Sequence, residues 1–281
     1  MAPVSIDALT SSTLKYLRER WWNDDFAEFL TETLRPRPGN RILDVGCGEG
    51  IADVGIGRLH VSQIRLFGVD LMIERVMVAR HETAAHNQRV GFACADVGHL
   101  PFRDDVFDCT FCVAVLQHVG DVTAAVAELA RVTSAGGRVL AVEPDNSARY
   151  SYSAIPTGVR AFEMSARFFA ALAAARGEIT DAAVGPRLPT LFAHHGIEPL
   201  EVRLFPVSQT RLSPPPPEVW DRRRAWVEQA IAEPPAESVR ALGREYLDVL
   251  DMYAADAGAA GSAFVEIQNT MLFATVGQKT E

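Results

Sequence analysis

The chain has 281 residues, which corresponds to about two domains of roughly 150 residues or to one large α/β domain with additions. Hydrophobic residues make up 48% and charged residues 22%, a composition that excludes an intrinsically disordered chain. Lys and Arg number 27 against 36 Asp and Glu, and the resulting net charge of −9 argues against nucleic acid as the main partner. No apolar run reaches the roughly 18 residues of a membrane span, and the first residues lack the pattern of a targeting peptide. We therefore expect a soluble cytoplasmic protein without a membrane partner.

The first predicted element is a helix that begins at Asp24 or Asp25 and stops at the proline-rich residues 36–39. Its apolar residues recur at helical spacing: Phe26, Phe29, Leu30 and Leu34. We predict that residues 1–39 form an N-terminal helical cap. Trp21 and Trp22 would then exclude water from a site on the following domain.

Residues 40–145 alternate between short apolar runs and helical patterns. The predicted strands are residues 41–45, 65–70, 90–95, 107–115 and 137–143. The predicted helices are residues 71–81 and 121–135, the second capped by Asp121 and ended by Gly136 and Gly137. Strands that alternate with helices predict an α/β fold, in which right-handed crossovers join parallel strands in a doubly wound, Rossmann-like sheet.

The remaining residues belong to the same predicted domain, which contains one insertion. A helix at residues 160–176, a shorter helix ending before Gly196 and strands at 197–209 and 264–276 are predicted. Four consecutive prolines, residues 214–217, cannot continue a helix or a central strand. They mark the start of a helical insertion at about 214–262, within a domain that spans residues 40–281.

Acidic residues end three successive strands. Asp44 precedes a glycine-rich stretch with Gly46, Gly48 and Gly50, and Asp70 and Asp96 end the next two strands. In open α/β sheets ligands bind at the carboxyl ends of the strands, where glycines let the backbone approach the ligand. A carboxylate such as Asp70 accepts bonds from ribose hydroxyls, and Asp96 is placed to accept one from an adenine amino group. The spacing predicts an adenosine site, although any one of these acids could instead cap a helix or a turn.

The glycine stretch argues against a dinucleotide. The dinucleotide pattern needs Gly or Ala at its sixth position, where this chain has Ile51. Asp44 suits an ammonium group better than a pyrophosphate. A ligand that combines adenosine with an amino acid fits these residues.

Taken together, the motifs resemble the class I S-adenosylmethionine-dependent methyltransferases, and most closely their small-molecule branch, which includes the ubiquinone and menaquinone methyltransferases. The matching stretches are LDVGCGEG, GVD, CADVGHLPF, FDCTFCVAVLQHV and ELARVTSAGGRVLAVEPD within residues 40–145, and FATVGQK at 273–279. The resemblance implies seven strands in the order 3-2-1-4-5-7-6, with strand 7 antiparallel. It also implies S-adenosylmethionine as cofactor and S-adenosylhomocysteine as product.

The resemblance assigns the cofactor residues one by one. Gly46, Gly48 and Gly50 would line the methionine part, and Asp70 with Leu71 would hold the ribose. Asp96 and Val97 would hold the adenine, and the backbone near Val113 would face the amino group. The following stretch, residues 51–62, departs from the pattern because Gly55 and Gly57 are poor helix formers, so its helix is expected to be late or irregular.

Methyl transfer from a sulfonium needs mostly proximity and alignment, and a base only when the acceptor must lose a proton. By resemblance His118 is the candidate base; a helix-start or packing role is the alternative, and Glu143 and Asp145 are the next candidates. No metal is expected, because Cys109 and Cys112, three residues apart on a strand, point to opposite faces. The sequence leaves a homodimer open.

The acceptor is predicted to be a small molecule, methylated on an O, N or C centre. Aromatic and Arg residues at 149–152, in the helix at 162–169 and in the insertion would form its pocket. Phe162, Phe168 and Phe169 can equally be core, and Arg222, Arg223 and Arg224 are expected on a solvated helix face. RNA or protein methylation, and a fold member that binds the cofactor without using it as methyl donor, are the alternative functions.

Overall fold

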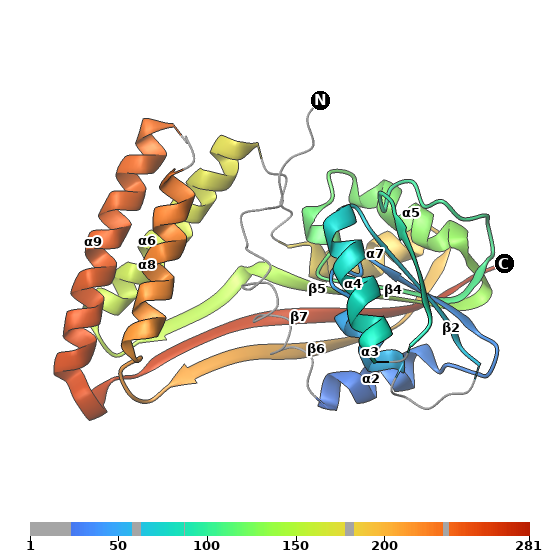
Figure 1. Cartoon of the computed structure of the whole chain (residues 1–281), viewed down its shortest axis with the longest axis horizontal. Coiled ribbons are helices and arrows are strands. Elements are labelled where there is room, and N and C mark those ends of the chain that lie inside the picture. Colours follow the sequence, from blue (N-terminus) through green and yellow to red (C-terminus); the bar gives the residue numbers. More distant parts are fainter. Residues whose placement is uncertain (1–23, 58–62, 87, 178–182, 233–235) are drawn as a thin grey trace. The chain divides into compact units, whose positions relative to one another are not determined.

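A computed structural model describes residues 24–57, 63–86, 88–177, 183–232 and 236–281. These residues fall into two compact units (Figure 1). The first, which we call the sheet unit, comprises the described residues up to 147 together with 183–205 and 271–281. The second, the helical unit, comprises 148–177, 206–232 and 236–270. Three long strands contribute residues to both units: β5 (Thr133–Ser153), β6 (Ile197–Arg211) and β7 (Glu266–Lys279).

The strands form one seven-stranded sheet in the order β3-β2-β1-β4-β5-β7-β6, which confirms the predicted order. The other four strands are β1 (Arg41–Val45), β2 (Arg65–Asp70), β3 (Val90–Cys94) and β4 (Phe107–Val113). Neighbours from β3 to β5 pair in parallel. β7 runs antiparallel to β5. The side chain of Gln278, near the end of β7, donates to the carbonyl of Gly136 near the start of β5. The amide of Ala154, just after β5, donates to the carbonyl of Val265, just before β7.

Helices cover both faces of this sheet. On one face α5 (Val122–Val132) and α7 (Val184–His194) share a core with Leu43 and Val45 of β1. The other helices of the unit are α2 (Asp24–Leu34), α3 (Ile51–Gly57) and α4 (Ile73–Ala85), and Figure 1 shows α3 and α4 together on the opposite face. The side chains of Cys109 and Cys112 in β4 lie on opposite faces of the sheet, as expected for positions three apart on a strand. Cys112 packs in the core with α5, and the thiol of Cys109 donates to the carbonyl of Leu34 in α2.

Helix α2 packs directly on the sheet. Phe26 and Phe29 are buried, and their rings lie 5.6 and 4.9 Å from the ring of Phe205 in β6. The predicted apolar face is therefore core of the sheet unit. Residues 1–23 of the expected cap, Trp21 and Trp22 included, lie outside the described residues.

Several predicted boundaries were wrong. The helix expected to be late, α3, begins directly after the glycine loop at Ile51, and the strand predicted at 107–115 ends at Val113. The junction between α5 and β5 differs for a local reason. β1 and β2 have the predicted bounds, but α5 ends at Val132 and β5 begins at once with Thr133. The Thr133 hydroxyl donates to the carbonyl of Leu129, and Thr133 already pairs with Phe107 in the sheet. Gly136 (φ 74°) and Gly137 lie at a shift of register between β4 and β5, so these glycines form an irregularity in the strand and do not end the helix.

The helical unit has its own core. Its helices are α6 (Pro156–Arg176), α8 (Pro217–Ala232) and α9 (Glu237–Ala260), followed by the short η2 (Gly261–Ala263). Phe168 is completely buried, and Phe169 stacks on Trp226 at 4.2 Å, which confirms the interpretation of these rings as core. α6, which was not part of the predicted insertion, thus packs with α8 and α9. No helix within the described ranges is both long and apolar enough to cross a membrane.

The three consecutive arginines of α8 are not a uniform solvated face, so that expectation was wrong for Arg223. Its guanidinium bonds to the fully buried carboxylate of Glu266 at 2.7 and 2.9 Å and lies 4.8 Å from the ring of Trp220. Arg211 and the Tyr253 hydroxyl donate to the same carboxylate. The spacing of residues along α8 cannot reveal that Arg223 is paired with a buried carboxylate, because its partner Glu266 lies on another element, β7.

Candidate functional site

The glycine loop after β1 has a backbone that other residues do not readily adopt. Gly46, Gly48 and Gly50 have φ values of 74°, 55° and 79°. A Cβ on Gly46 would come within 2.3 Å of the Val115 side chain, and one on Gly50 within 3.1 Å of Ala79. Backbone conformation and packing therefore both require glycine, and the loop carries little side-chain bulk at the end of β1.

Asp70, the last residue of β2, is the anchor of this loop. One carboxylate oxygen accepts from the Gly48 amide at 2.9 Å, and the other accepts from the Met72 amide at 2.9 Å. The side chain is 7% exposed, and each oxygen retains a second lone pair. The carboxylate thus fixes the glycine loop against the start of α4 and can still accept hydrogen bonds from a ligand.

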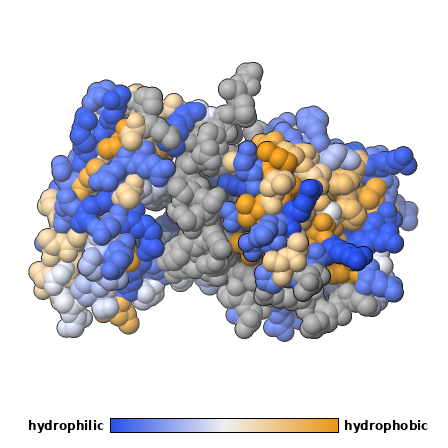
Figure 2. Space-filling model, in the orientation of Figure 1, coloured by the Kyte–Doolittle hydropathy of each residue, from blue (hydrophilic) through white to orange (hydrophobic). Residues whose placement is uncertain are grey.

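The next residues of the predicted site follow β3. This strand ends at Cys94, one residue earlier than predicted, so Asp96 lies two residues beyond it. Asp96 is exposed and accepts from the Gly98 amide at 2.8 Å, and Val97 packs against the core. Leu71 is 52% exposed beside Asp70, and Ile73 and Met77 of α4 are about as exposed. In Figure 2, hydrophobic residues gather on the face of the sheet unit that is turned toward the viewer.

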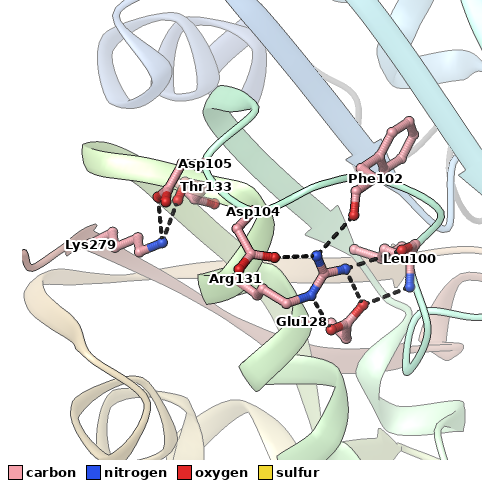
Figure 3. A network of polar contacts seen from close by, with 8 residues as sticks. All are labelled: Leu100, Phe102, Asp104, Asp105, Glu128, Arg131, Thr133 and Lys279. Carbon is pink, nitrogen blue, oxygen red and sulfur yellow. Dashed lines mark hydrogen bonds and ion pairs between the residues drawn. The ribbon is translucent and has the colours of Figure 1, made fainter.

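A polar network fixes the loop that continues from Asp96 (Figure 3). The guanidinium of Arg131 in α5 donates to the carbonyls of Leu100 and Phe102 at 3.1 and 2.8 Å and pairs with Glu128 and Asp104. Glu128 also accepts from the Leu100 amide at 2.7 Å. The β3–β4 loop therefore has one defined conformation, held from α5.

Two buried acids lie at the methionine end of the predicted site. Asp44 in β1 is 3% exposed, and Asp53 in the first turn of α3 is 1% exposed. Neither oxygen of Asp53 has a hydrogen-bond partner among the described residues. Burial, and then the charge of Asp44, raise the pKa of Asp53 well above its usual value. Asp53 could not be singled out from its sequence position, because an acid in the first turn of a helix is ordinarily a solvated capping residue.

The turn after β4 carries His118. Val113 ends the strand, Ala114 has a φ of 56°, and residues Leu116–His118 form the short helix η1. The His118 side chain is exposed. Glu143 of β5 accepts hydrogen bonds from three backbone amides of this turn, at Val115, Leu116 and Gln117. The candidate base therefore lies on a structured turn at the carboxyl end of β4.

The structure thus brings most of the predicted residues to one edge of the sheet. Asp44, the three glycines, Asp70, Val113 and the turn with His118 belong to the ends of neighbouring strands, and the Ala95 amide donates to the carbonyl of Asp70, which connects Asp96 to them. Tyr150 and Tyr152 belong to the helical unit and are exposed. Glu143 cannot serve as an accessible base, because its side chain is fully buried and both its oxygens accept backbone amides.

A doubly wound sheet of this order, with glycines and acids at the carboxyl ends of its strands, is typical of nucleoside-binding α/β proteins. Residues 43–141 match the family model described as a methyltransferase domain. The matched stretch runs from β1 into β5, so this part of the sheet unit is similar to the methyltransferase domains of that family.

Curated relatives match over about half of the chain. An O-methyltransferase of Pyrenophora dematioidea is 29% identical over 148 residues, which are 47% of this chain and 55% of the relative. A demethylmenaquinone methyltransferase of Mycobacterium marinum is 30% identical over 136 residues, 48% of this chain and 53% of the relative. The chain thus spans about half the length of these relatives.

Solved structures share the fold at low sequence identity. The YcgJ protein of Bacillus subtilis has a TM-score of 0.59 and 19% identity, and the match covers 92% of this chain and 100% of that chain. The [4+2]-cyclase SpnF has a TM-score of 0.53 and 20% identity, with 92% of this chain and 81% of that chain covered. The fold therefore occurs in a protein named as a cyclase as well as in methyltransferases.

Proposed function

We propose that the protein transfers a methyl group from S-adenosylmethionine to an O, N or C centre of a small-molecule metabolite. The observation that carries this proposal is the Asp70 carboxylate, held at the edge of the sheet by the Gly48 and Met72 amides, with a lone pair free on each oxygen. In this position it accepts the two ribose hydroxyls of an adenosine.

The other residues of this edge suit the remaining parts of the cofactor. Leu71 and Val97 offer apolar surface to the adenine, and Asp96 offers a carboxylate oxygen to its amino group. The glycine loop leaves room for the methionine part, whose ammonium group suits the buried acids Asp44 and Asp53. The unpartnered oxygens of Asp53 suit a cationic ligand as well, because a positive charge beside them would offset the burial that raises the pKa of this acid.

When bound, S-adenosylmethionine supplies a methyl group on a positively charged sulfur. The protein then contributes alignment of the acceptor and exclusion of water. His118, exposed on the turn after β4, is the proposed proton acceptor for a hydroxyl acceptor. An acceptor that attacks through carbon or a neutral amine needs only the alignment.

Two alternatives predict different results. Methylation of RNA is disfavoured by the net charge of −9, whereas methylation of a protein stays a candidate. A reaction that uses the bound cofactor without methyl transfer stays a candidate, because the fold is also that of a protein named as a cyclase.

The test is transfer of a labelled methyl group from S-adenosylmethionine to a fractionated metabolite extract, with S-adenosylhomocysteine release measured in parallel. We expect a labelled small molecule in an amount that equals the S-adenosylhomocysteine released. Label in RNA or protein alone would support the macromolecular alternative. Tight cofactor binding with no label transferred to any fraction would contradict methyl transfer.

A further inference from the structure

The turn between β4 and α5 is tied to β5 by one side chain. Oε1 of Glu143 accepts from the amides of Val115 at 2.8 Å and Leu116 at 2.7 Å, and Oε2 accepts from the amide of Gln117 at 3.3 Å. The Glu143 side chain is completely buried. One carboxylate thus satisfies three consecutive backbone donors directly before His118.

Further contacts fix the same turn between the glycine loop and His118. Ala114, in the left-handed region with φ 56°, donates its amide to the carbonyl of Val142 at 2.8 Å. The side chain of Val115 fills the space that a Cβ on Gly46 would need. The first residues of this turn, at Val115, therefore contact the glycine loop, and its last residue is His118.

We propose that Glu143 is a positioning residue, whose ionised carboxylate holds the turn from Val115 to Gln117 and so fixes the backbone that presents His118 to the acceptor. This inference rests on the proposed function for its catalytic consequence. The holding of the turn itself does not depend on that function.

The ionised form accepts all three amides most strongly. A proton on Oε2, the oxygen with the longer bond, makes that oxygen a donor and a much weaker acceptor, so the bond from the Gln117 amide weakens. Oε1 then still accepts from Val115 and Leu116. Protonation of Glu143 should therefore loosen the part of the turn next to His118 and spare the contact between Val115 and Gly46.

This change falls in an accessible pH range. Burial raises the pKa of Glu143 to about 7, although its three backbone hydrogen bonds act in the opposite direction. Among the described residues, the neighbouring titratable groups are Cys112 on β4, Asp44 on β1, Asp145 on β5 and His118 on the turn itself. Cys112 stays neutral here, because burial, then Glu143 and Asp44, raise the pKa of its thiol.

A glutamate at this buried position needs a reason beyond folding. Burial makes ionisation of Glu143 less favourable than in water, and its three backbone hydrogen bonds offset this only in part. A glutamine could accept the Val115 and Leu116 amides without carrying a charge. A carboxylate, unlike a glutamine, can also accept the Gln117 amide, which lies next to His118.

The variant Glu143→Gln isolates that third amide. Its amide oxygen can replace Oε1, while its NH₂ group opposes the Gln117 amide as another donor. The matched control is Glu198→Gln, which removes an exposed carboxylate on β6. Both variants should fold, and Glu143→Gln should be at least as stable as the native chain at pH 8.

The direct readout is amide hydrogen exchange resolved by NMR on the full chain, corrected for the intrinsic effect of pH. From pH 8 to pH 5.5 we expect protection of the Gln117 amide to fall by about fivefold, the contribution of one ordinary hydrogen bond. Glu143→Gln should show the low value at every pH, with protection at Val115 and Leu116 and the Kd of S-adenosylhomocysteine changed less than threefold. Protection of Gln117 that is independent of pH, or lost together with Val115 and Leu116, would overturn the proposal.

The catalytic readout is a double-mutant cycle between Glu143 and His118, with the acceptor identified as above. Glu143→Gln should lower kcat about tenfold at pH 8 in the native background and less than twofold in the His118→Ala background. Equal losses in both backgrounds would mean that Glu143 does not act through His118, and would overturn the inference. Absence of methyl transfer in the native chain would contradict the proposed function, whereas the exchange experiment would still decide whether Glu143 holds the turn.

Discussion

Asp70 illustrates how one residue can have a structural and a ligand-binding role. Its carboxylate holds the Gly48 and Met72 amides and is also the proposed ribose acceptor. A loss of cofactor affinity in Asp70→Ala would therefore mix loss of the loop conformation with loss of the ribose contact. The two effects have to be separated with a change in the ligand.

We expect Asp70→Ala to weaken S-adenosylhomocysteine by at least tenfold, because each charge-assisted hydrogen bond contributes about 1.5 to 3 kcal/mol. Calorimetry should then compare the ligand with its 2′,3′-dideoxy analogue. The native chain should lose affinity for the analogue, while Asp70→Ala should bind both compounds equally weakly. Equal discrimination by both proteins would show that Asp70 acts on the loop alone.

The residue scale also shows what sequence spacing can reveal. Asp70 and the glycines were predictable, because a strand end and a glycine-rich turn are local patterns with a known place at the edge of a sheet. The burial of Asp53 and the amide bonds of Glu143 were not, because both depend on residues distant in the chain. Glu143 was found as a candidate base, but its contacts make it an acceptor for backbone amides.

At the scale of elements, α2 belongs to the core on which the sheet is built. Phe29 is 1% exposed, and its ring contacts Phe26 and Phe205 and lies 5.0 Å from the guanidinium of Arg203. The pattern of apolar residues predicted the helix and its buried face correctly. It could not show that the face packs on β6, because β6 lies more than 160 residues further along the chain.

We therefore expect Phe29→Ala to lower the free energy of unfolding by about 3 to 5 kcal/mol, as for other buried phenylalanines. The folded fraction should bind S-adenosylhomocysteine with unchanged affinity. Urea denaturation and calorimetry measure the two quantities, with exposed Glu28→Ala on the same helix as the control. A change in stability below 1 kcal/mol with a large loss of turnover would instead support a cap function for this helix.

The β3–β4 loop depends on α5 in a similar way. Arg131 holds the carbonyls of Leu100 and Phe102, whereas its partner Asp104 is 70% exposed. Arg131→Met keeps the aliphatic stem and should lower the free energy of unfolding by about 2 kcal/mol. Cofactor affinity should fall as well, because the loop begins at Asp96.

The matched control for Arg131→Met is Asp104→Asn, which removes only an exposed ion pair and should change stability by less than about 0.5 kcal/mol. Denaturation curves and calorimetry on both variants test this difference. Equal effects would show that the exposed pair, and not the carbonyl contacts, holds the loop.

At the scale of the whole molecule, each unit buries one glutamate among the residues that the structure describes, and the two have opposite pKa shifts. In the helical unit burial tends to raise the pKa of Glu266, but the hydrogen bonds and charge of Arg223, together with the charge of Arg211, hold it below its usual value. In the sheet unit burial raises the pKa of Glu143 from 4.5 to about 7. Their contributions to stability should therefore depend on pH in opposite directions.

The signs follow from proton linkage. Between pH 4.5 and about 7 the folded sheet unit binds a proton at Glu143 that the unfolded chain has released, so stability falls as pH rises through this range. Glu266 has a lowered pKa, so its contribution is present above the usual range of a glutamate and is lost as pH falls below it. Asp53 of the sheet unit, whose pKa burial also raises, acts in the same direction as Glu143, so a variant of Glu143 is needed to isolate its part.

We expect hydrogen exchange measured by mass spectrometry to reveal this difference peptide by peptide. From pH 5 to 8 the opening free energy of the sheet unit should fall by up to about 3 kcal/mol, since the shift from 4.5 to about 7 is 2.5 pKa units at 1.36 kcal/mol each. Glu143→Gln should remove the Glu143 part of that decrease, and the difference between the native chain and this variant cancels the titration of Asp53 and the other groups. Peptides of the helical unit should change little over the same range. A decrease of the same size in the native chain and in Glu143→Gln would assign the titration to another group, and parallel curves in both units would mean that the two open as one cooperative structure.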